Sequence, residues 1–289
     1  MKRVAFLGTG IMGSRMAANV ARAGFDLTVW NRTASKAEAV AEATGARLAS
    51  TPAEAANGAD ATITMVVDSP EVEAVLFGEN GASEAMAAGA LAIDMSTIAP
   101  SATREVAERL RERGIGFLDA PVSGSSPRAE DGTLTIMVGG AGEDFERARP
   151  LLDSMGELIV HVGPQGHGSL VKLLNNTLAA INAAALAEAL TVARRADVDL
   201  DALVRVTAAS SGNSTMLALK AKPMIEHDFE PLFRLDHMLK DVRHCLATAA
   251  ELGAKAPVGE AAKGLYEAAS SNGLGDDDFA AVVQAVEEV

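Results

Sequence analysis

Cysteine, aromatic residues and basic runs are scarce in this chain of 289 residues, and each scarcity excludes a class of protein. The single cysteine, Cys245, leaves no partner for an internal disulfide, which favours a reducing cytosol. Aromatic residues make up 3% of the chain, which argues against recognition by stacking. Lys and Arg total 25 against 39 Asp and Glu, so the formal net charge is −14. Nucleic acids and anionic membranes are therefore poor partners.

Targeting and membrane-spanning segments are not expected either. The apolar run after Met1-Lys2-Arg3 stops after four residues at a glycine-rich turn, too short for the apolar region of a signal peptide. The run Leu170–Ala187 nears transmembrane length, but it contains Lys172 and three Asn residues. We expect a soluble, cytoplasmic protein, and the length allows two domains, each with its own core.

The start of the chain carries a phosphate-binding pattern. The apolar run Val4–Leu7 leads directly into Gly8-Thr9-Gly10-Ile11-Met12-Gly13, and a helical segment separates this turn from a second apolar run, Leu27–Trp30. The first glycine permits the tight turn, the second a close approach to a pyrophosphate, and the third close packing of helix on strand. A helix N-terminus also attracts phosphate. The sequence therefore predicts dinucleotide binding here; the alternative is a glycine turn without a ligand.

The end of the second apolar run indicates which nicotinamide cofactor is bound. NAD-binding chains usually place Asp or Glu there to hold the ribose 2′-hydroxyl, whereas this chain has Asn31-Arg32-Thr33 and no acid. The guanidinium of Arg32 can pair with a 2′-phosphate that a carboxylate would repel, and Asn31 and Thr33 add donors. We expect a preference for NADP(H) without excluding NAD(H). The alternative is that Arg32 is a solvated loop residue.

Segments of strand and helix character alternate along the first half of the chain. Further strands are expected at Ala61–Val67, Ala90–Met95, the segment from Gly116, Leu134–Val138 and Leu158–Val162, with helices at Pro52–Asn57 and Ser101–Arg113. Repeated units of this kind predict an α/β Rossmann domain with a doubly wound, mostly parallel sheet. In such a sheet the site lies at the carboxyl ends of the strands.

Residues at these strand ends are candidate cofactor contacts. Val66 and Val67 end one expected strand, Ser96-Thr97 follows the next, and Ser123-Gly124 follows the segment from Gly116. We expect these residues to surround the cofactor. Ser96 and Thr97 are also suited to a helix N-cap or a turn.

The alternation stops near Gly163, and only helical signals follow. The expected helices are Ser169–Arg195, Leu200–Ser210, Thr215–Met224, Arg234–Leu252, Pro257–Asn272 and Asp276–Glu288. We therefore expect a Rossmann domain over residues 1–163 and an all-helical domain over residues 164–289.

The first of these helices is the longest segment without a helix breaker, since neither Gly nor Pro occurs between Ser169 and Gly212. From Leu170 to Val192 it is apolar around its circumference, so it should be buried on all sides, in a core or against a partner subunit. Burying a lysine in such a helix costs free energy, because its ammonium group loses water, unless another group pairs with it. Lys172 and Asn176, four residues apart, share a face. The pair is either a structural hydrogen-bonded plug or part of a pocket.

Four motifs, in order along the whole chain, resemble those of the β-hydroxyacid dehydrogenases. They are Phe6-Leu7-Gly8-Thr9-Gly10-Ile11-Met12-Gly13, Asp119-Ala120-Pro121-Val122-Ser123-Gly124, Gly168-x-x-x-Lys172-x-x-x-Asn176, and Phe233 followed by Lys240-Asp241. The stretch Ser125–Leu134 departs from the Gly-Gly run of 3-hydroxyisobutyrate dehydrogenases. It is more similar to the glyoxylate/succinic semialdehyde reductase branch, whose members favour NADPH. The resemblance implies a Rossmann domain, a helical domain, a long helix bridging them, and dimers or tetramers formed through the helical domains.

The resemblance also implies a role for each matched residue. Lys172 is the catalytic lysine and Asn176 its companion, Ser123 and Gly124 bind the substrate carboxylate, Thr97, Phe233 and Asp241 line the pocket, and Lys240 lies beside the cofactor. Plainer alternatives remain: Phe233 as core, Asp241 as a surface partner of Arg243 or Arg234, and Lys240 as a solvated residue. The histidines form no zinc-type pattern, so no metal site is expected.

The implied activity is NADPH-dependent reduction of a small aldehyde acid, glyoxylate or succinic semialdehyde, to the hydroxy acid. A lysine such as Lys172 can donate the proton that the carbonyl oxygen needs if burial or nearby positive charge lowers its pKa. Alternatives within the family are 3-hydroxyisobutyrate and tartronate semialdehyde chemistry. Outside it are an imine reductase or a non-catalytic NADPH-binding protein, both disfavoured by the lysine. A phosphogluconate-type dehydrogenase is disfavoured by chain length and by the lack of a basic phosphate cluster.

Overall fold

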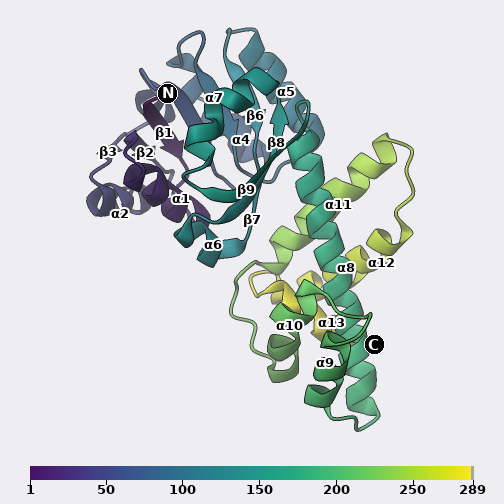
Figure 1. Cartoon of the computed structure of the whole chain (residues 1–289). Coiled ribbons are helices and arrows are strands. Elements are labelled where there is room, and N and C mark those ends of the chain that lie inside the picture. Colours follow the sequence, from purple (N-terminus) through teal and green to yellow (C-terminus); the bar gives the residue numbers. More distant parts are fainter. Residues whose placement is uncertain (288–289) are drawn as a thin grey trace. The chain divides into compact units, whose positions relative to one another are not determined.

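The chain divides into two compact units, Met1–Lys172 and Leu173–Val289. The computed structural model describes residues 1–287 (Figure 1). The first unit contains every strand of the described residues, and the second is helical. Helix α8 (His167–Arg195) begins in the first unit and continues through the second.

The first unit alternates strands and helices up to β9. Its strands are β1 (Arg3–Leu7), β2 (Asp26–Trp30), β3 (Arg47–Leu48), β4 (Ala61–Thr64), β5 (Leu91–Asp94), β6 (Gly116–Asp119), β7 (Val122–Ser123), β8 (Leu134–Gly140) and β9 (Gly156–Gly163). Its helices before α8 are α1 (Ile11–Arg22), α2 (Ala34–Thr44), α3 (Pro52–Ala56), α4 (Ser69–Phe77), α5 (Pro100–Arg111), α6 (Ser125–Asp131) and α7 (Gly142–Leu152). The α/β Rossmann prediction is confirmed.

The strands form one sheet in the order β3-β2-β1-β4-β5-β6-β8-β7, with β9 paired to β8. Strands β1 to β6 run parallel, whereas β8 is antiparallel to both β6 and β7 and parallel to β9. The sheet is thus doubly wound and mostly parallel, as predicted. The carboxyl ends of β1, β2, β4, β5 and β6 therefore share one edge.

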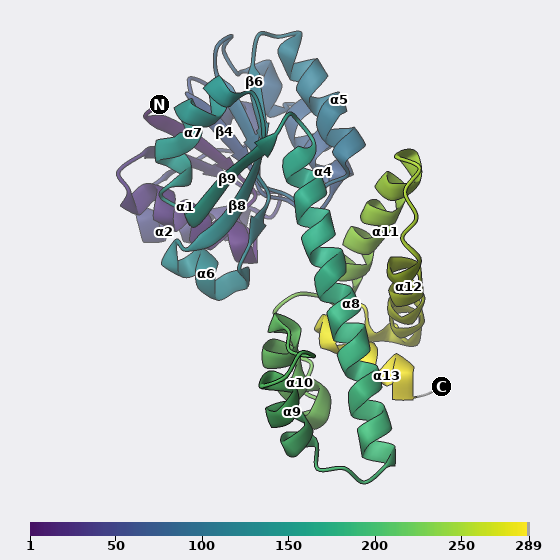
Figure 2. The same cartoon turned by 45° about the vertical axis from the view of Figure 1, so that its right-hand side comes forward.

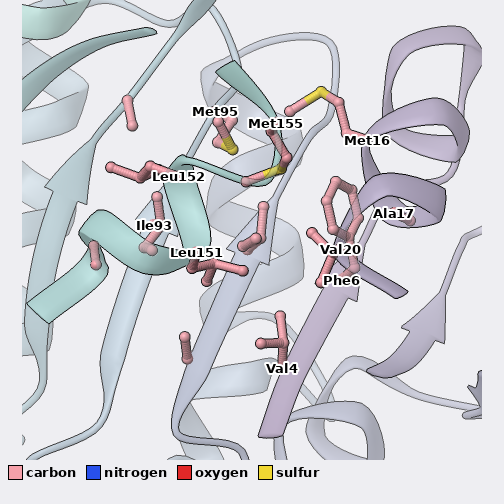
Figure 3. Packing of buried hydrophobic residues seen from close by; sticks show 14 of the residues in the cluster. Val4, Phe6, Met16, Ala17, Val20, Ile93, Met95, Leu151, Leu152 and Met155 are labelled. Atoms are coloured by element: carbon pink, nitrogen blue, oxygen red, sulfur yellow. The ribbon is translucent and has the colours of Figure 1, made fainter. Parts of the chain in front are cut away.

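Both faces of this sheet are buried, because helices cover each of them. Val4 and Phe6 of β1 belong to a core shared with α1 and α7, whereas Ala5 and Leu7 belong to the core on the opposite face. Figure 3 shows the first of these cores, with Met16 of α1 packed toward the strands. Strands buried on both faces read as continuous apolar runs, which is why the sequence pattern was clear.

The second unit is built from the rest of α8 and five further helices. These are α9 (Leu200–Ala208), α10 (Thr215–Glu226), α11 (Leu235–Glu251), α12 (Pro257–Ala269) and α13 (Val282–Glu287). Helices α11 and α12 lie side by side (Figures 1 and 2). Tyr266 of α12 is fully buried, and its hydroxyl donates to the carbonyl of Ala180 in α8 at 3.2 Å. The prediction of an all-helical second part is confirmed.

Two helix predictions in the second unit were wrong in detail. The helix expected over Pro257–Asn272 ends at Ala269, and a π-turn follows. The helix expected over Asp276–Glu288 is instead a short 3₁₀ turn after Asp278 and then α13; residue 288 lies outside the described residues. The carboxylate of Asp278 accepts a hydrogen bond from the backbone N–H of Ala280, so Asp278 is a cap rather than an interior helical residue.

Helix α8 covers the predicted range but is not buried on all sides within one chain. Leu178 and Val192 are 62% and 69% exposed. Among the described residues, α8 is also the one helix long and apolar enough, by length and composition, to span a membrane; 44% of that window is buried. The core helix of a soluble protein passes the same test. Contact of its exposed face with a partner subunit remains a prediction.

Candidate active site

The glycine-rich turn lies between β1 and α1 and forms a cradle. A Cβ on Gly8 (φ +103°) would lie 2.2 Å from the carbonyl oxygen of Met65, and one on Gly13 would lie 1.9 Å from the carbonyl oxygen of Gly8. By contrast, a Cβ on Gly10 would meet nothing within 4 Å. Two glycines are therefore required by protein contacts, and the middle one faces open space.

The start of α1 has the polar groups that a phosphate needs. No side chain caps this helix end, because Gly10 is the N-cap residue, so the N–H groups of the first turn are left for a ligand. The Thr9 hydroxyl is buried without a hydrogen-bond partner among the described residues. An orphaned donor and an open cradle at a helix N-terminus fit the pyrophosphate of a dinucleotide.

Asn31 at the end of β2 braces this turn. Its Oδ1 accepts from the backbone N–H of Thr9 at 3.0 Å, and its Nδ2 donates to the carbonyl of Thr33 at 2.9 Å. Arg32 and Thr33 are exposed at the start of α2. Asn31 thus uses one of its two amide N–H groups within the chain, and Arg32 is an exposed cation at the same strand end.

A buried carboxylate links the ends of β4 and β5. Asp94 accepts hydrogen bonds from the Thr64 hydroxyl (2.7 Å) and from the backbone N–H of Ser96 (3.2 Å). The Ser96 hydroxyl in turn accepts from the backbone N–H of Val66 at 2.9 Å. Burial, with a smaller contribution from the nearby Asp119, raises the pKa of Asp94 to about 6. Ser96 therefore serves as a brace between the two strand ends.

Val66, Val67 and Thr97 occupy the strand ends as predicted from sequence. Val66 and Thr97 are half-buried, and Val67 is 50% exposed. All three follow strands that share the carboxyl edge with β1, beside which the glycine cradle lies. Their contact with a cofactor stays a prediction.

The turn from β7 into α6 is conformationally unusual. Ser123 is half-buried in β7, and Gly124 and Ser125 follow with φ angles of +135° and +57°. A Cβ on Gly124 would lie 2.7 Å from the side chain of Arg128, whose stem covers this glycine. The turn therefore requires glycine at position 124, whereas Ser125 holds a left-handed conformation that a β-carbon disfavours.

Lys172 lies in the second turn of α8 and is 7% exposed. Gly168, Ser169 and Asn176 occupy the same face of the helix and are also buried. The lysine is therefore held in a largely dry environment, as the sequence predicted.

The second unit assembles three of the predicted residues. Asn176 donates through Nδ2 to Oδ2 of Asp241 at 2.6 Å, and Lys240 Nζ lies 2.9 Å from Oδ1 of the same carboxylate. Asp241 is fully buried, so the alternative of a surface partner for an arginine is excluded. Phe233 is half-buried, and its ring packs edge-on against His237 and Phe279.

Sequence reasoning missed the partners that hold the site together. Asp94 lies in an expected strand and Asp119 opens one of the four family motifs. Nothing in the local sequence indicated that they accept hydrogen bonds from another strand and from α8. The buried ion pair between Lys220 and Asp278, 2.7 Å long, was also missed. The position of Lys220 among apolar residues of an expected helix was a signal in the sequence that could have indicated this pair.

Comparison with known proteins gives consistent results over the whole chain. Residues 3–163 match the NAD binding domain of 6-phosphogluconate dehydrogenase, and residues 166–286 match the NAD-binding family of NADP-dependent 3-hydroxyisobutyrate dehydrogenase. Glyoxylate/succinic semialdehyde reductase 2 of Arabidopsis thaliana is 37% identical over 98% of this chain and 79% of its own length. The 2-hydroxy-3-oxopropionate reductase of Escherichia coli is 38% identical over 99% of this chain and 97% of its own.

A solved structure extends the similarity to three dimensions. The 3-hydroxyisobutyrate dehydrogenase of Mycobacterium tuberculosis, with L-serine, is 33% identical and superposes with a TM-score of 0.90 over 99% of each chain.

Proposed function

Because this chain belongs to the β-hydroxyacid dehydrogenase family of NAD(P)-dependent oxidoreductases, we propose that it reduces a small aldehyde acid with NADPH. The substrate class of the family is small hydroxy acids and semialdehydes. Glyoxylate or succinic semialdehyde is the proposed substrate, and 3-hydroxyisobutyrate or tartronate semialdehyde chemistry is the alternative. The observation that carries the proposal is a lysine, 7% exposed, on a helix whose residues are mostly apolar.

The dinucleotide is assigned to the glycine cradle at residues 8–13, with Val66, Val67, Thr97 and Lys240 as further contacts. The bound nicotinamide supplies the hydride. NADPH preference rests on Arg32, which is exposed at the end of β2 where no carboxylate opposes a 2′-phosphate. Asn31 and Thr33 are proposed as further contacts, and Asn31 also braces the cradle through its hydrogen bond from the Thr9 N–H.

Lys172 is the proposed general acid. As an ammonium it polarises the carbonyl oxygen of the substrate and donates the proton that the resulting alkoxide requires; the neutral amine takes the proton back in the reverse direction. Burial of Lys172 limits the access of water to the reacting atoms. Asn176, one helical turn further on, is held by Asp241 and orients the substrate hydroxyl or the amine.

The substrate carboxylate is assigned to the Ser123 hydroxyl and the backbone N–H groups beside Gly124. Thr97, Phe233 and Asp241 are assigned to the pocket lining. The stem of Arg128 packs against Gly124, so a glycine is needed in the turn that presents these N–H groups.

The remaining assignments complete the proposal. Residues 1–163 are the proposed NADP-binding domain, which also supplies the Ser123 and Gly124 contacts to the substrate. Residues 164–289 are the proposed substrate and oligomerisation domain, which forms a homodimer or homotetramer through exposed apolar positions of α8 such as Leu178. The single cysteine and the acidic charge favour a cytoplasmic enzyme.

An oxidation assay tests the proposal. NADPH and NADH are mixed with glyoxylate, succinic semialdehyde, tartronate semialdehyde or methylmalonate semialdehyde, using the wild type and Arg32→Ala. We expect turnover with at least one aldehyde acid and a lower KM for NADPH. Arg32→Ala should raise the KM for NADPH by about 10-fold, because it removes one charge-assisted contact to the 2′-phosphate. The KM for NADH should stay unchanged. A wild type that prefers NADH contradicts the cofactor assignment, and inactivity with the whole panel contradicts the substrate class.

A further inference from the structure

Asp119 is a fully buried carboxylate at the end of β6 that has no part in the proposed chemistry. Its Oδ1 accepts from the backbone N–H of Gly166 at 2.9 Å, and its Oδ2 accepts from the backbone N–H of Ser169 at 2.8 Å. These two N–H groups belong to the N-cap position and the third residue of α8. Asp119 therefore caps a helix whose N-cap residue, Gly166, lies 47 residues later in the chain.

The helix has no cap of its own at this end. Gly166, at φ +87°, stands where Ser, Asp or Asn usually caps a helix and has no side chain to offer. Gln165 donates instead to the carbonyl of Phe117 at 3.4 Å. A carboxylate at a helix N-terminus is favourable for the helix dipole as well as for the free N–H groups. The cap that the local sequence lacks is supplied by the sheet.

Two glycines bring the helix start into direct contact with the strands. A Cβ on Gly168 would lie 2.5 Å from the carbonyl oxygens of both Asp119 and Met137. A Cβ on Gly139 of β8 would lie 2.5 Å from Oδ1 of Asp119 and 2.8 Å from the backbone nitrogen of Gly168. The first turn of α8 thus rests directly on the backbone of β6 and β8, beside the carboxylate of Asp119.

A second tether holds the same turn from another element. The hydroxyl of Ser169 lies 3.0 Å from the hydroxyl of Thr103 in α5, and both groups are buried. Lys172 follows Ser169 by three residues and Gly168 by four, so it projects from the face of the helix that is anchored. A shift of the first turn would carry the lysine with it.

We propose that Asp119 is a positioning residue for Lys172, because its carboxylate fixes the first turn of α8 to the carboxyl edge of the sheet. The proposal rests on the proposed function, since it assumes that the amine of Lys172 reacts. A displacement of about 1 Å in a reacting group can cost about 100-fold in rate. Gly139 and Gly168 pack directly against Asp119, so a change at this carboxylate shifts the first turn of α8.

The test uses Asp119→Asn, which keeps one acceptor and loses the other. With NADPH and the aldehyde acid of the panel, kcat should fall by about 10- to 100-fold, while the KM values and the affinity for NADPH change less than about threefold. The primary isotope effect on kcat with 4-deuterated NADPH should rise, because chemistry becomes slower than product release. Asp199→Ala, which removes the N-cap of α9 in the second unit, is the matched control and should keep the wild-type isotope effect.

A second variant and a second readout separate the possible failures. If Asp119→Asn does not fold, Thr103→Val removes only the second tether and should give a smaller loss of kcat with the same rise in the isotope effect. A readout that does not require activity is the rate at which acetic anhydride acetylates Lys172, relative to the rate for the buried Lys220. This relative rate should rise several-fold in Asp119→Asn and stay unchanged in Asp199→Ala.

The outcomes are distinct. A folded Asp119→Asn protein with wild-type kcat, isotope effect and acetylation rate overturns the positioning role. A loss of kcat that merely follows the folded fraction, with an unchanged isotope effect, also overturns it. Inactivity of the wild type with the whole panel contradicts the proposed function alone, and the acetylation rates then still decide whether Asp119 holds the lysine.

Discussion

The two units satisfy their buried carboxylates in different ways. In the first unit, Asp94 and Asp119 stand opposite each other on neighbouring parallel strands and accept hydrogen bonds from backbone N–H groups and a hydroxyl. In the second unit, Asp241 and Asp278 lie 2.9 and 2.7 Å from lysine ammonium groups. The buried carboxylates of the first unit are thus stabilised by neutral donors, whereas those of the second unit also have a lysine ammonium group nearby.

The difference follows from where free backbone donors occur. Strand ends and helix starts leave N–H groups without an intrasegment partner, so a carboxylate at the carboxyl edge of a parallel sheet finds donors there. Inside a helix such as α11, each N–H already bonds the preceding turn, so Asp241 depends on side chains. Burial raises the pKa of Asp94 and Asp119, and hydrogen bonds from neutral donors offset this only in part, so the stability of the first unit depends on pH.

The largest effect is expected from removing a cation in the second unit. Lys220→Met leaves the carboxylate of Asp278 buried without its ammonium partner, and both side chains are at most 5% exposed. The free energy of unfolding in urea should fall by about 3–5 kcal/mol. Lys222→Met is the matched control on the same helix, because Lys222 is 79% exposed and 3.8 Å from Glu226; its effect should stay within about 0.5 kcal/mol. Equal effects of the two variants would contradict the importance of the cation.

The next effect is a pH dependence in the first unit. The pKa of Asp94 is about 6 in the folded chain against 3.8 for an ordinary aspartate, so the unfolded chain loses this proton first as pH rises. The stabilisation that the protonated Asp94 carboxyl contributes is complete below the pKa of Asp94 in the unfolded chain. It is lost as pH rises through about 6, and the free energy of unfolding then falls by about 3 kcal/mol. The wild type should therefore lose stability relative to Asp94→Asn between about pH 4 and 7.

Urea unfolding of both proteins across this pH range measures the difference. A difference that does not vary with pH would mean that the strand-end carboxyl is ionised throughout and that neutral donors suffice to keep its pKa low.

The smallest effect tests the turn beside β7. Ser125 has φ +57°, and Ser125→Gly should raise the free energy of unfolding by about 1 kcal/mol because glycine adopts this conformation without strain. Ser126→Gly, one residue further into α6, is the control and should lower it by about 0.5–1 kcal/mol. Thermal unfolding distinguishes the two signs, and two variants of the same sign would show that strain at residue 125 is negligible.

Local pattern was enough to predict most of the fold but not its long-range partners. The glycine fingerprint, the alternation to Gly163 and the helix through Arg195 all depend on periodicity and chain breakers, which are local. The antiparallel pairing of β8 with β6 depends on tertiary packing, and sequence did not predict it. The same holds for Asp119, because the N–H groups that it binds belong to residues 47 and 50 positions away. Every residue except proline has a backbone N–H, so residue type does not show which of them bonds to Asp119.

Substitution of Lys172 tests the central claim most directly. Lys172→Met keeps the length and apolar stem of the side chain and removes the amine, so kcat should fall by about 10²- to 10⁴-fold. The affinity for NADPH and the midpoint of thermal unfolding should stay close to wild-type values, because methionine fills nearly the same buried volume. Lys222→Met should retain full activity. A stable Lys172→Met enzyme with wild-type kcat, or one that unfolds while its residual folded fraction turns over normally, would contradict a catalytic lysine.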